Sequence, residues 1–87
     1  MKQKSIPTNL TNAIDILNQE ISENDKRYIL ENGSLSVHHT LGRWIRNNWG
    51  LWGNSELKQN IIKFTGFTHP DDMSNYIIEQ FIKYLKN

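Results

Sequence analysis

All three tryptophans of this 87-residue chain fall in one short segment, LGRWIRNNWGLW, which runs from Leu41 to Trp52. The same segment holds two of the three arginines. A chain of this length buries only about two-thirds of the surface that it exposes when unfolded, so it can hold only one hydrophobic core. We therefore expect some of the large indole side chains to lie in that core. This limits the fold to a single domain organised around one segment.

Composition excludes several classes of protein. Hydrophobic residues make up 37% of the chain, charged residues 22%, and the net charge is +1, which is typical of a folded globular domain. The absence of cysteine excludes a disulfide framework, a thiolate metal site and a cysteine nucleophile. The isoelectric point of about 8.0 argues against a nucleic-acid partner, because such domains are usually strongly basic. We see no signal peptide and no membrane-length apolar run, and therefore expect a cytoplasmic protein that does not associate with membranes.

Hydrophobic residues recur at helical spacing throughout, with no alternating strand pattern, so we predict an all-α fold. Residues 1–7 are expected to form a flexible lead, and residues 8–87 a single helical domain. Start signals lie at Thr8–Asn9, Ser22, Ser36, Asn54–Ser55 and Thr68–Pro70, and stop signals at Gly33, Gly50 and Gly66. Because each of the five predicted helices is only about two to four turns long, we expect a compact orthogonal array.

The third predicted helix, from Ser36 to about Trp49, has an apolar and a basic side. The apolar stripe contains Val37, Leu41, Trp44, Ile45 and Asn48, and the basic stripe contains His39, Arg43, Arg46 and Asn47. Trp44, together with Trp52 from the following turn, is expected near the centre of the domain. At least one indole N–H should then donate to a backbone carbonyl or to an asparagine side chain.

A second unusual motif, HPDDMS at residues 69–74, begins the last predicted helix. Asp71 and Asp72 there face the partly positive helix N-terminus. We expect Arg46, with Arg43, to reach these carboxylates, because a guanidinium group can pair with a carboxylate through two parallel hydrogen bonds. This contact has two interpretations: it defines the fold, or it belongs to a cleft that binds a ligand or partner group. The candidate site residues are His38, Arg43, Arg46, Asn47, Trp49, Trp52, His69, Asp71 and Asp72.

The two motifs together resemble a family of small bacterial domains of unknown function. In that family the first motif reads approximately His-x-x-Leu-Gly-x-Trp-Ile-Arg-Asn-x-Trp-Gly-Leu-Trp, and His-Pro-Asp-Asp-Met-Ser follows later in the chain. The resemblance extends to PTNL at residues 7–10 and covers nearly the whole sequence. Its motif positions here are residues 38, 41–42, 44–47, 49–52 and 69–74. The resemblance implies no activity.

Metal binding and catalysis both lack a supporting pattern. His38 and His39 are adjacent, so in a helix they would project about 100° apart and only one of them could join His69 at a metal. Consecutive carboxylates such as Asp71 and Asp72 also diverge on a helix, which disfavours paired acid–base chemistry. We therefore predict no catalytic residue, metal or cofactor, and a hydrolytic or metal-dependent enzyme stays an alternative.

The function that we predict is a non-catalytic protein-interaction module with an unknown partner. Tryptophan, tyrosine and arginine are the residues that commonly anchor protein contacts, and an exposed tryptophan in the turn from Gly50 to Gly53 would be such an anchor. An immunity or antitoxin-like protein is one version of this function. The alternative is a domain that binds a small ligand or nucleic acid through the candidate cleft and the basic stripe. The sequence does not indicate an oligomeric state.

Overall fold

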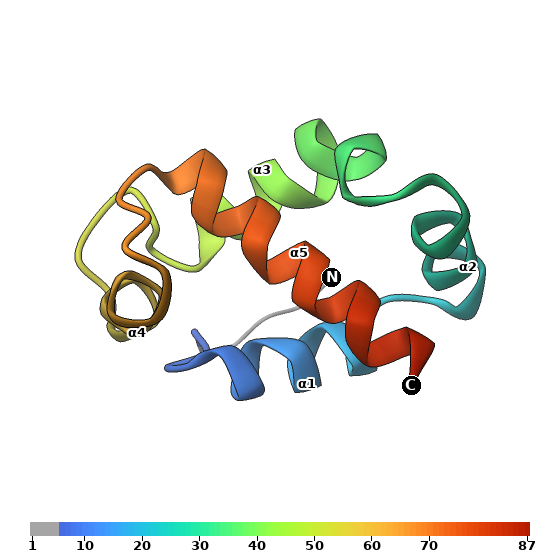
Figure 1. Ribbon diagram of the computed structural model, residues 1–87, viewed down its shortest axis with the longest axis horizontal. Coiled ribbons are helices and arrows are strands. Elements are labelled where there is room, and N and C mark those ends of the chain that lie inside the picture. Colours follow the sequence, from blue (N-terminus) through green and yellow to red (C-terminus); the bar gives the residue numbers. More distant parts are fainter. Residues whose placement is uncertain (1–5) are drawn as a thin grey trace.

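A computed structural model describes residues 6–87 and places five α-helices, one 3-10 turn and one π turn in them (Figure 1). In chain order these are α1 (Leu10–Glu20), α2 (Glu23–Asn32), η1 (Ser34–Val37), η2 (His38–Gly42), α3 (Arg43–Asn48), α4 (Glu56–Thr65) and α5 (Pro70–Lys86). The described residues form no strand, and the predicted all-α fold is confirmed. Of the lead predicted over residues 1–7, residues 1–5 lie outside the described part, and Pro7 is buried.

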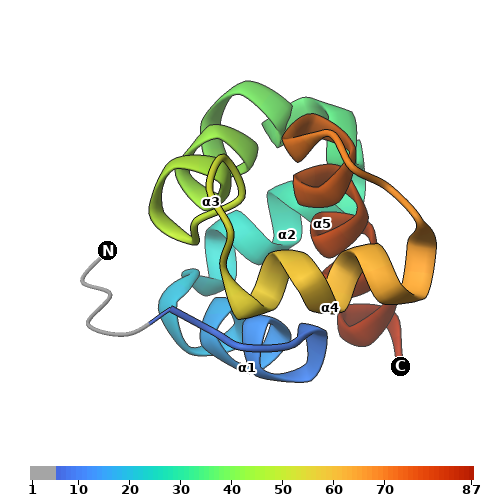
Figure 2. The ribbon, with the colours of Figure 1, turned by 90° about the vertical axis from the view of Figure 1, so that its left-hand side faces the viewer.

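Helix α5 is the longest of these elements, with 17 residues, and it runs through the middle of the molecule (Figure 1). It contacts α1, α2, α3 and both η turns. Its apolar residues repeat at helical spacing, so almost all of its length can face the core; the buried ones are Met73, Ile77, Ile78 and Phe81. Helix α4 contacts α1, and Figure 2 shows it crossing the molecule in front of α5. Helices α1, α2 and α3 are thus gathered around one central helix.

The capping residues predicted from the sequence begin three of the helices. Asn9 accepts a hydrogen bond from the Asn12 backbone N–H at 2.9 Å. Ser22 and Ser55 do the same for the residues three positions later, each at 3.2 Å. Such caps satisfy backbone donors that a helix leaves free at its start. The predicted starts of α1, α2 and α4 are therefore confirmed.

The single long helix predicted from Ser36 to Trp49 is wrong. The chain instead forms η1, η2 and α3 in succession, and Ser36 lies inside η1, where its hydroxyl donates to the Gly33 carbonyl oxygen. A π turn holds one residue more than an α turn, so the residues after it rotate by about 100° relative to a continuous helix. The buried positions move one residue along the chain, to Gly42, Ile45, Arg46 and Trp49.

This rotation changes which tryptophan fills the core. Trp49 is fully buried and, with Phe81, is one of the two largest buried side chains, whereas Trp44 is only half-buried. Trp52 is 60% exposed. The prediction that Trp44 and Trp52 lie at the centre is therefore wrong. Phe64 on α4 also lies mostly in solvent.

Gly50 and Gly53 flank the turn between α3 and α4, and the structure predicts different effects of substituting them. Gly50 has a φ of +71°, and a Cβ atom there would lie 2.9 Å from Cβ of Ser55. Ser55 cannot easily move, because it caps α4 and donates to the Trp49 carbonyl oxygen at 3.1 Å. We expect Gly50→Ala to lower the free energy of unfolding by about 2 kcal/mol through backbone strain and crowding.

Gly53→Ala is the matched control for this prediction. A Cβ atom at Gly53 would meet only the Gly50 carbonyl oxygen, at an ordinary 3.8 Å. Its effect should stay within about 0.5 kcal/mol. Urea denaturation followed by tryptophan fluorescence measures both values, and equal losses at the two positions would contradict the strain argument.

Candidate functional site

Arg46 lies on α3, and its buried side chain contacts both the π turn η2 and the start of α5. Its side chain is only 8% exposed, and its Nε atom lies 3.2 Å from Oδ1 of Asp71. Its two terminal nitrogens donate to Ser74 Oγ at 2.9 Å and to the His38 carbonyl oxygen at 3.5 Å. We call this arrangement of Arg46, Asp71, Ser74 and the His38 carbonyl the Arg46 clamp. It joins two segments that are far apart in the sequence.

Small residues make room for the clamp. Ser74 is fully buried, and its hydroxyl also donates to the Asp71 carbonyl oxygen at 3.1 Å, so the hydroxyl is held in place. A Cβ atom at Gly42 would lie 3.0 Å from a terminal nitrogen of Arg46. The glycine therefore leaves the space that the guanidinium group occupies. Charge and shape together explain why this cation can be buried, because buried charges need both an ion partner and hydrogen bonds.

The neighbouring charged residues of the two motifs stay outside the clamp. Arg43 and Asp72 are exposed, and within residues 6–87 neither forms an ion pair. Only one of the two predicted arginines and one of the two predicted aspartates therefore meet.

Three other candidates lie close together on the surface, and we call them the Trp52 surface: Asn47, Trp52 and His69. The Trp52 indole Nε1 donates to Asn47 Oδ1 at 3.0 Å. The His69 ring lies edge-on to the indole, with 6.3 Å between ring centroids. His69 itself caps α5, because its Nδ1 accepts from the Asp71 backbone N–H at 3.1 Å. An exposed tryptophan is thus held from both motifs.

The last two candidates, Trp49 and His38, do not belong to the Trp52 surface. Trp49 lies in the core, edge-on to Trp44 with 5.6 Å between ring centroids, and its Nε1 has no hydrogen-bond partner among the described residues. The expected indole hydrogen bond to an asparagine is therefore made by exposed Trp52 instead of a buried tryptophan. His38 is half-buried, and its ring packs edge-on to His39. Within residues 6–87, no three His, Asp or Glu side chains gather as they would around a metal ion.

A family model described as "Domain of unknown function (DUF6794)" matches residues 6–85. The chain belongs to this family. The predicted resemblance to a family without an assigned function is confirmed at that level. Comparison with curated proteins and with solved structures gave no match. In the described part of this DUF6794 domain, no helix is long and apolar enough to cross a membrane.

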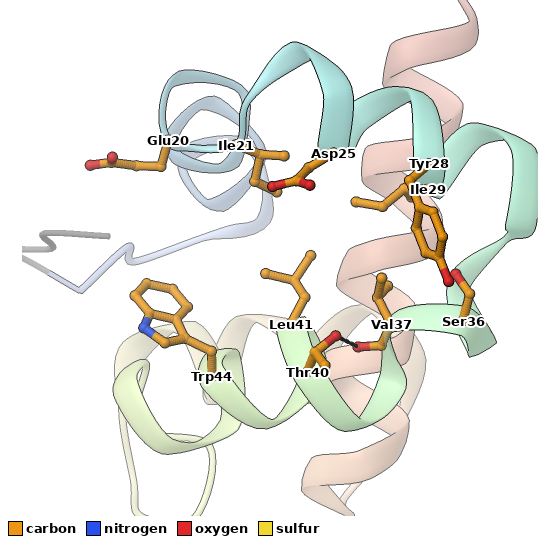
Figure 3. Close-up of a pocket in the computed structure, with 10 residues that line it drawn as sticks. All are labelled: Glu20, Ile21, Asp25, Tyr28, Ile29, Ser36, Val37, Thr40, Leu41 and Trp44. Carbon is orange, nitrogen blue, oxygen red and sulfur yellow. Dashed lines mark hydrogen bonds between the residues drawn. The ribbon is translucent and has the colours of Figure 1, made fainter.

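This DUF6794 domain also has a groove, of about 710 Å³, between α2 and the segment from Ser36 to Trp44 (Figure 3). Its apolar lining residues are Ile21, Ile29, Val37, Leu41 and Trp44. Its charged lining residues are Glu20, at the end of α1, and Asp25, in the first turn of α2. None of the nine candidate residues lines it. Sequence patterns gave no signal for this groove, since it forms only when the α1–α2 junction packs beside η2.

Proposed function

We propose that this domain is a non-catalytic protein-interaction module that binds its partner through the Trp52 surface. The observation that carries the proposal is a tryptophan that is 60% exposed yet fixed by the hydrogen bond to Asn47. Tryptophan offers a large apolar area with few rotatable bonds, and it is among the residues that dominate binding energy at interfaces. A side chain that is already held in place loses less entropy when it binds.

The turn that carries Trp52 supports this proposal. The Gly53 backbone N–H donates to the Gly50 carbonyl oxygen at 3.1 Å, which closes the turn. The Lys58 side chain donates to the Gly53 carbonyl oxygen at 2.9 Å and ties the turn to α4. The backbone on both sides of Trp52 is therefore bonded, and the indole projects from a defined position.

The burial of Arg46 weakens the nucleic-acid alternative. That alternative needs an exposed basic stripe, because phosphate contacts are made by accessible cations. Arg46 belongs to the predicted stripe but is buried and paired with Asp71, so it is not accessible to phosphates. A narrower form of our proposal is a bacterial immunity or antitoxin-like protein that acts in the cytoplasm on a toxin.

Replacing Trp52 with alanine tests the proposal. We expect Trp52→Ala to weaken partner binding by about thirtyfold, the effect of losing a dominant interface residue. Stability should change little, because the indole is mostly in solvent. The full chain is used as bait in extract of its host, captured proteins are quantified by mass spectrometry, and binding of the recovered partner is measured by titration.

Phe64→Ala is the matched control, since Phe64 is a 70% exposed aromatic residue on α4, outside the Trp52 surface. It should leave capture unchanged. The proposal is wrong if no protein is captured by the unaltered chain in preference to Trp52→Ala, or if both variants lose binding equally.

A further inference from the structure

The groove beside α2 carries an inference about a second surface that does not depend on Trp52. We propose that it binds a short segment of a partner protein in which an apolar side chain lies next to a lysine or arginine. The groove would hold the apolar side chain, and the carboxylates at its rim would meet the cation.

The lining of the groove accounts for the apolar part of this segment. Leu41 and Trp44 are half-buried, so part of each side chain remains accessible from the groove. Ile21, Ile29 and Val37 are buried; Figure 3 shows Ile21 and Ile29 across the groove from Leu41, and Val37 on the same side as Leu41. The volume of about 710 Å³ lies within the roughly 300–1,000 Å³ typical of binding sites in proteins. Filling it with an apolar group would remove the exposed parts of Leu41 and Trp44 from water.

The charges of the groove account for the cation. Glu20 and Asp25 are its two charged lining residues, both exposed, and no lysine, arginine or histidine is among the lining residues. Figure 3 shows Asp25 directed into the groove above Leu41, and Glu20 at the end where the Trp44 indole lies. A cation at this end of the groove could pair with the Glu20 carboxylate and also contact the face of the Trp44 ring, because aromatic faces attract lysine and arginine. Complementary charge of this kind selects one partner over another.

The surroundings of the groove favour a protein segment. Tyr28, which lines the groove, is 52% exposed, and Figure 3 shows it at the opposite end from Trp44. Accessible aromatic side chains therefore lie at both ends of the groove. A peptide with further apolar residues can contact both, as segments that bind in grooves do with successive side chains.

The test selects ligands without assuming a partner. A phage-displayed library of short random peptides is screened against the full chain, and the enriched peptides are synthesised with a fluorophore for anisotropy titration. We expect enrichment of lysine or arginine beside leucine, isoleucine, phenylalanine or tryptophan. The double variant Glu20→Gln/Asp25→Asn should bind these peptides about tenfold more weakly, and added salt should narrow the difference.

The double variant Asp15→Asn/Glu31→Gln is the matched control. It removes the same two charges from exposed positions on the same two helices, and neither residue lines the groove. It should bind the peptides like the unaltered chain, as should Trp52→Ala. A loss of partner capture in Trp52→Ala with unchanged peptide affinity thus separates the two surfaces.

Several outcomes would overturn the inference. The screen could yield no peptide that binds, or the peptides that bind could show no enrichment of lysine or arginine. The groove variant and the control variant could also lose the same amount of peptide affinity. Sedimentation velocity adds one more: if the unaltered chain dimerises and Leu41→Glu makes it monomeric, a second copy of the chain occupies the groove instead of a partner segment.

Discussion

Replacing Trp49 with alanine is expected to lower the free energy of unfolding by about 4 kcal/mol, as large-to-small changes of buried aromatic residues do. Trp49 is fully buried, and it packs edge-on against Trp44. Alanine would leave a cavity next to the Trp49 carbonyl oxygen, which accepts a hydrogen bond from the Ser55 hydroxyl, so the turn could not collapse freely into it. Domains commonly have only about 5–15 kcal/mol of stability, so the variant should unfold at much lower urea concentration.

Circular dichroism is the suitable measurement, because the substitution alters tryptophan fluorescence directly. Trp52→Ala is the matched control: it removes the same side chain from an exposed position and should cost less than about 1 kcal/mol. Trp49→Phe should fall between the two, since it keeps an aromatic ring but fills less volume. A cost for Trp49→Ala no greater than for Trp52→Ala would contradict the assignment of Trp49 to the core.

Replacing Arg46 with alanine is expected to cost about 3 kcal/mol, through the loss of charge-assisted hydrogen bonds and of packing by the buried side chain. The buried Ser74 hydroxyl would also lose the hydrogen bond that it accepts from the Arg46 guanidinium group. Asp71→Asn should cost less, about 1.5 kcal/mol, because Asp71 is 46% exposed and water screens the pair. It would nevertheless leave the buried guanidinium group without its carboxylate.

A double-mutant cycle shows whether these two residues act together. If Arg46 and Asp71 form one clamp, the cost of the double variant should be smaller than the sum of the single costs by about 1 kcal/mol. Arg43→Ala and Asp72→Asn are the controls, because each is the same residue type nearby in the chain but exposed. Additive losses for Arg46 and Asp71, or equal losses in the control pair, would contradict the clamp.

Local signals explain the part of the fold that could be predicted. Helix caps are formed by Asn9, Ser22 and Ser55, and each of these side chains bonds to a residue only three positions later in the chain. A cap of this kind can therefore be recognised from a few consecutive residues. The positive φ angles of Gly33 and Gly66 likewise belong to helix ends that a glycine signals by itself. The proximity of Arg46 to the last helix was expected from the chemistry of the side chains alone.

The π turn explains most of what could not be predicted. Periodicity assumes a constant rotation per residue, so the extra residue between His38 and Gly42 exchanges the roles of Trp44 and Trp49. The same exchange buries Arg46 while leaving Asn47 exposed. The groove was out of reach for a different reason: Glu20, Asp25 and Trp44 come from three separate helices and meet only through packing.

The central position of α5 has a consequence for the nascent protein. Helix α5 follows all the other described elements in the chain, and it is the one that α1, α2 and α3 contact. The ribosome therefore completes these three helices before their common packing surface exists. Until Phe81 has left the exit tunnel, their apolar faces stay accessible to chaperones and proteases, because these helices cannot reach their final packing before α5 is present.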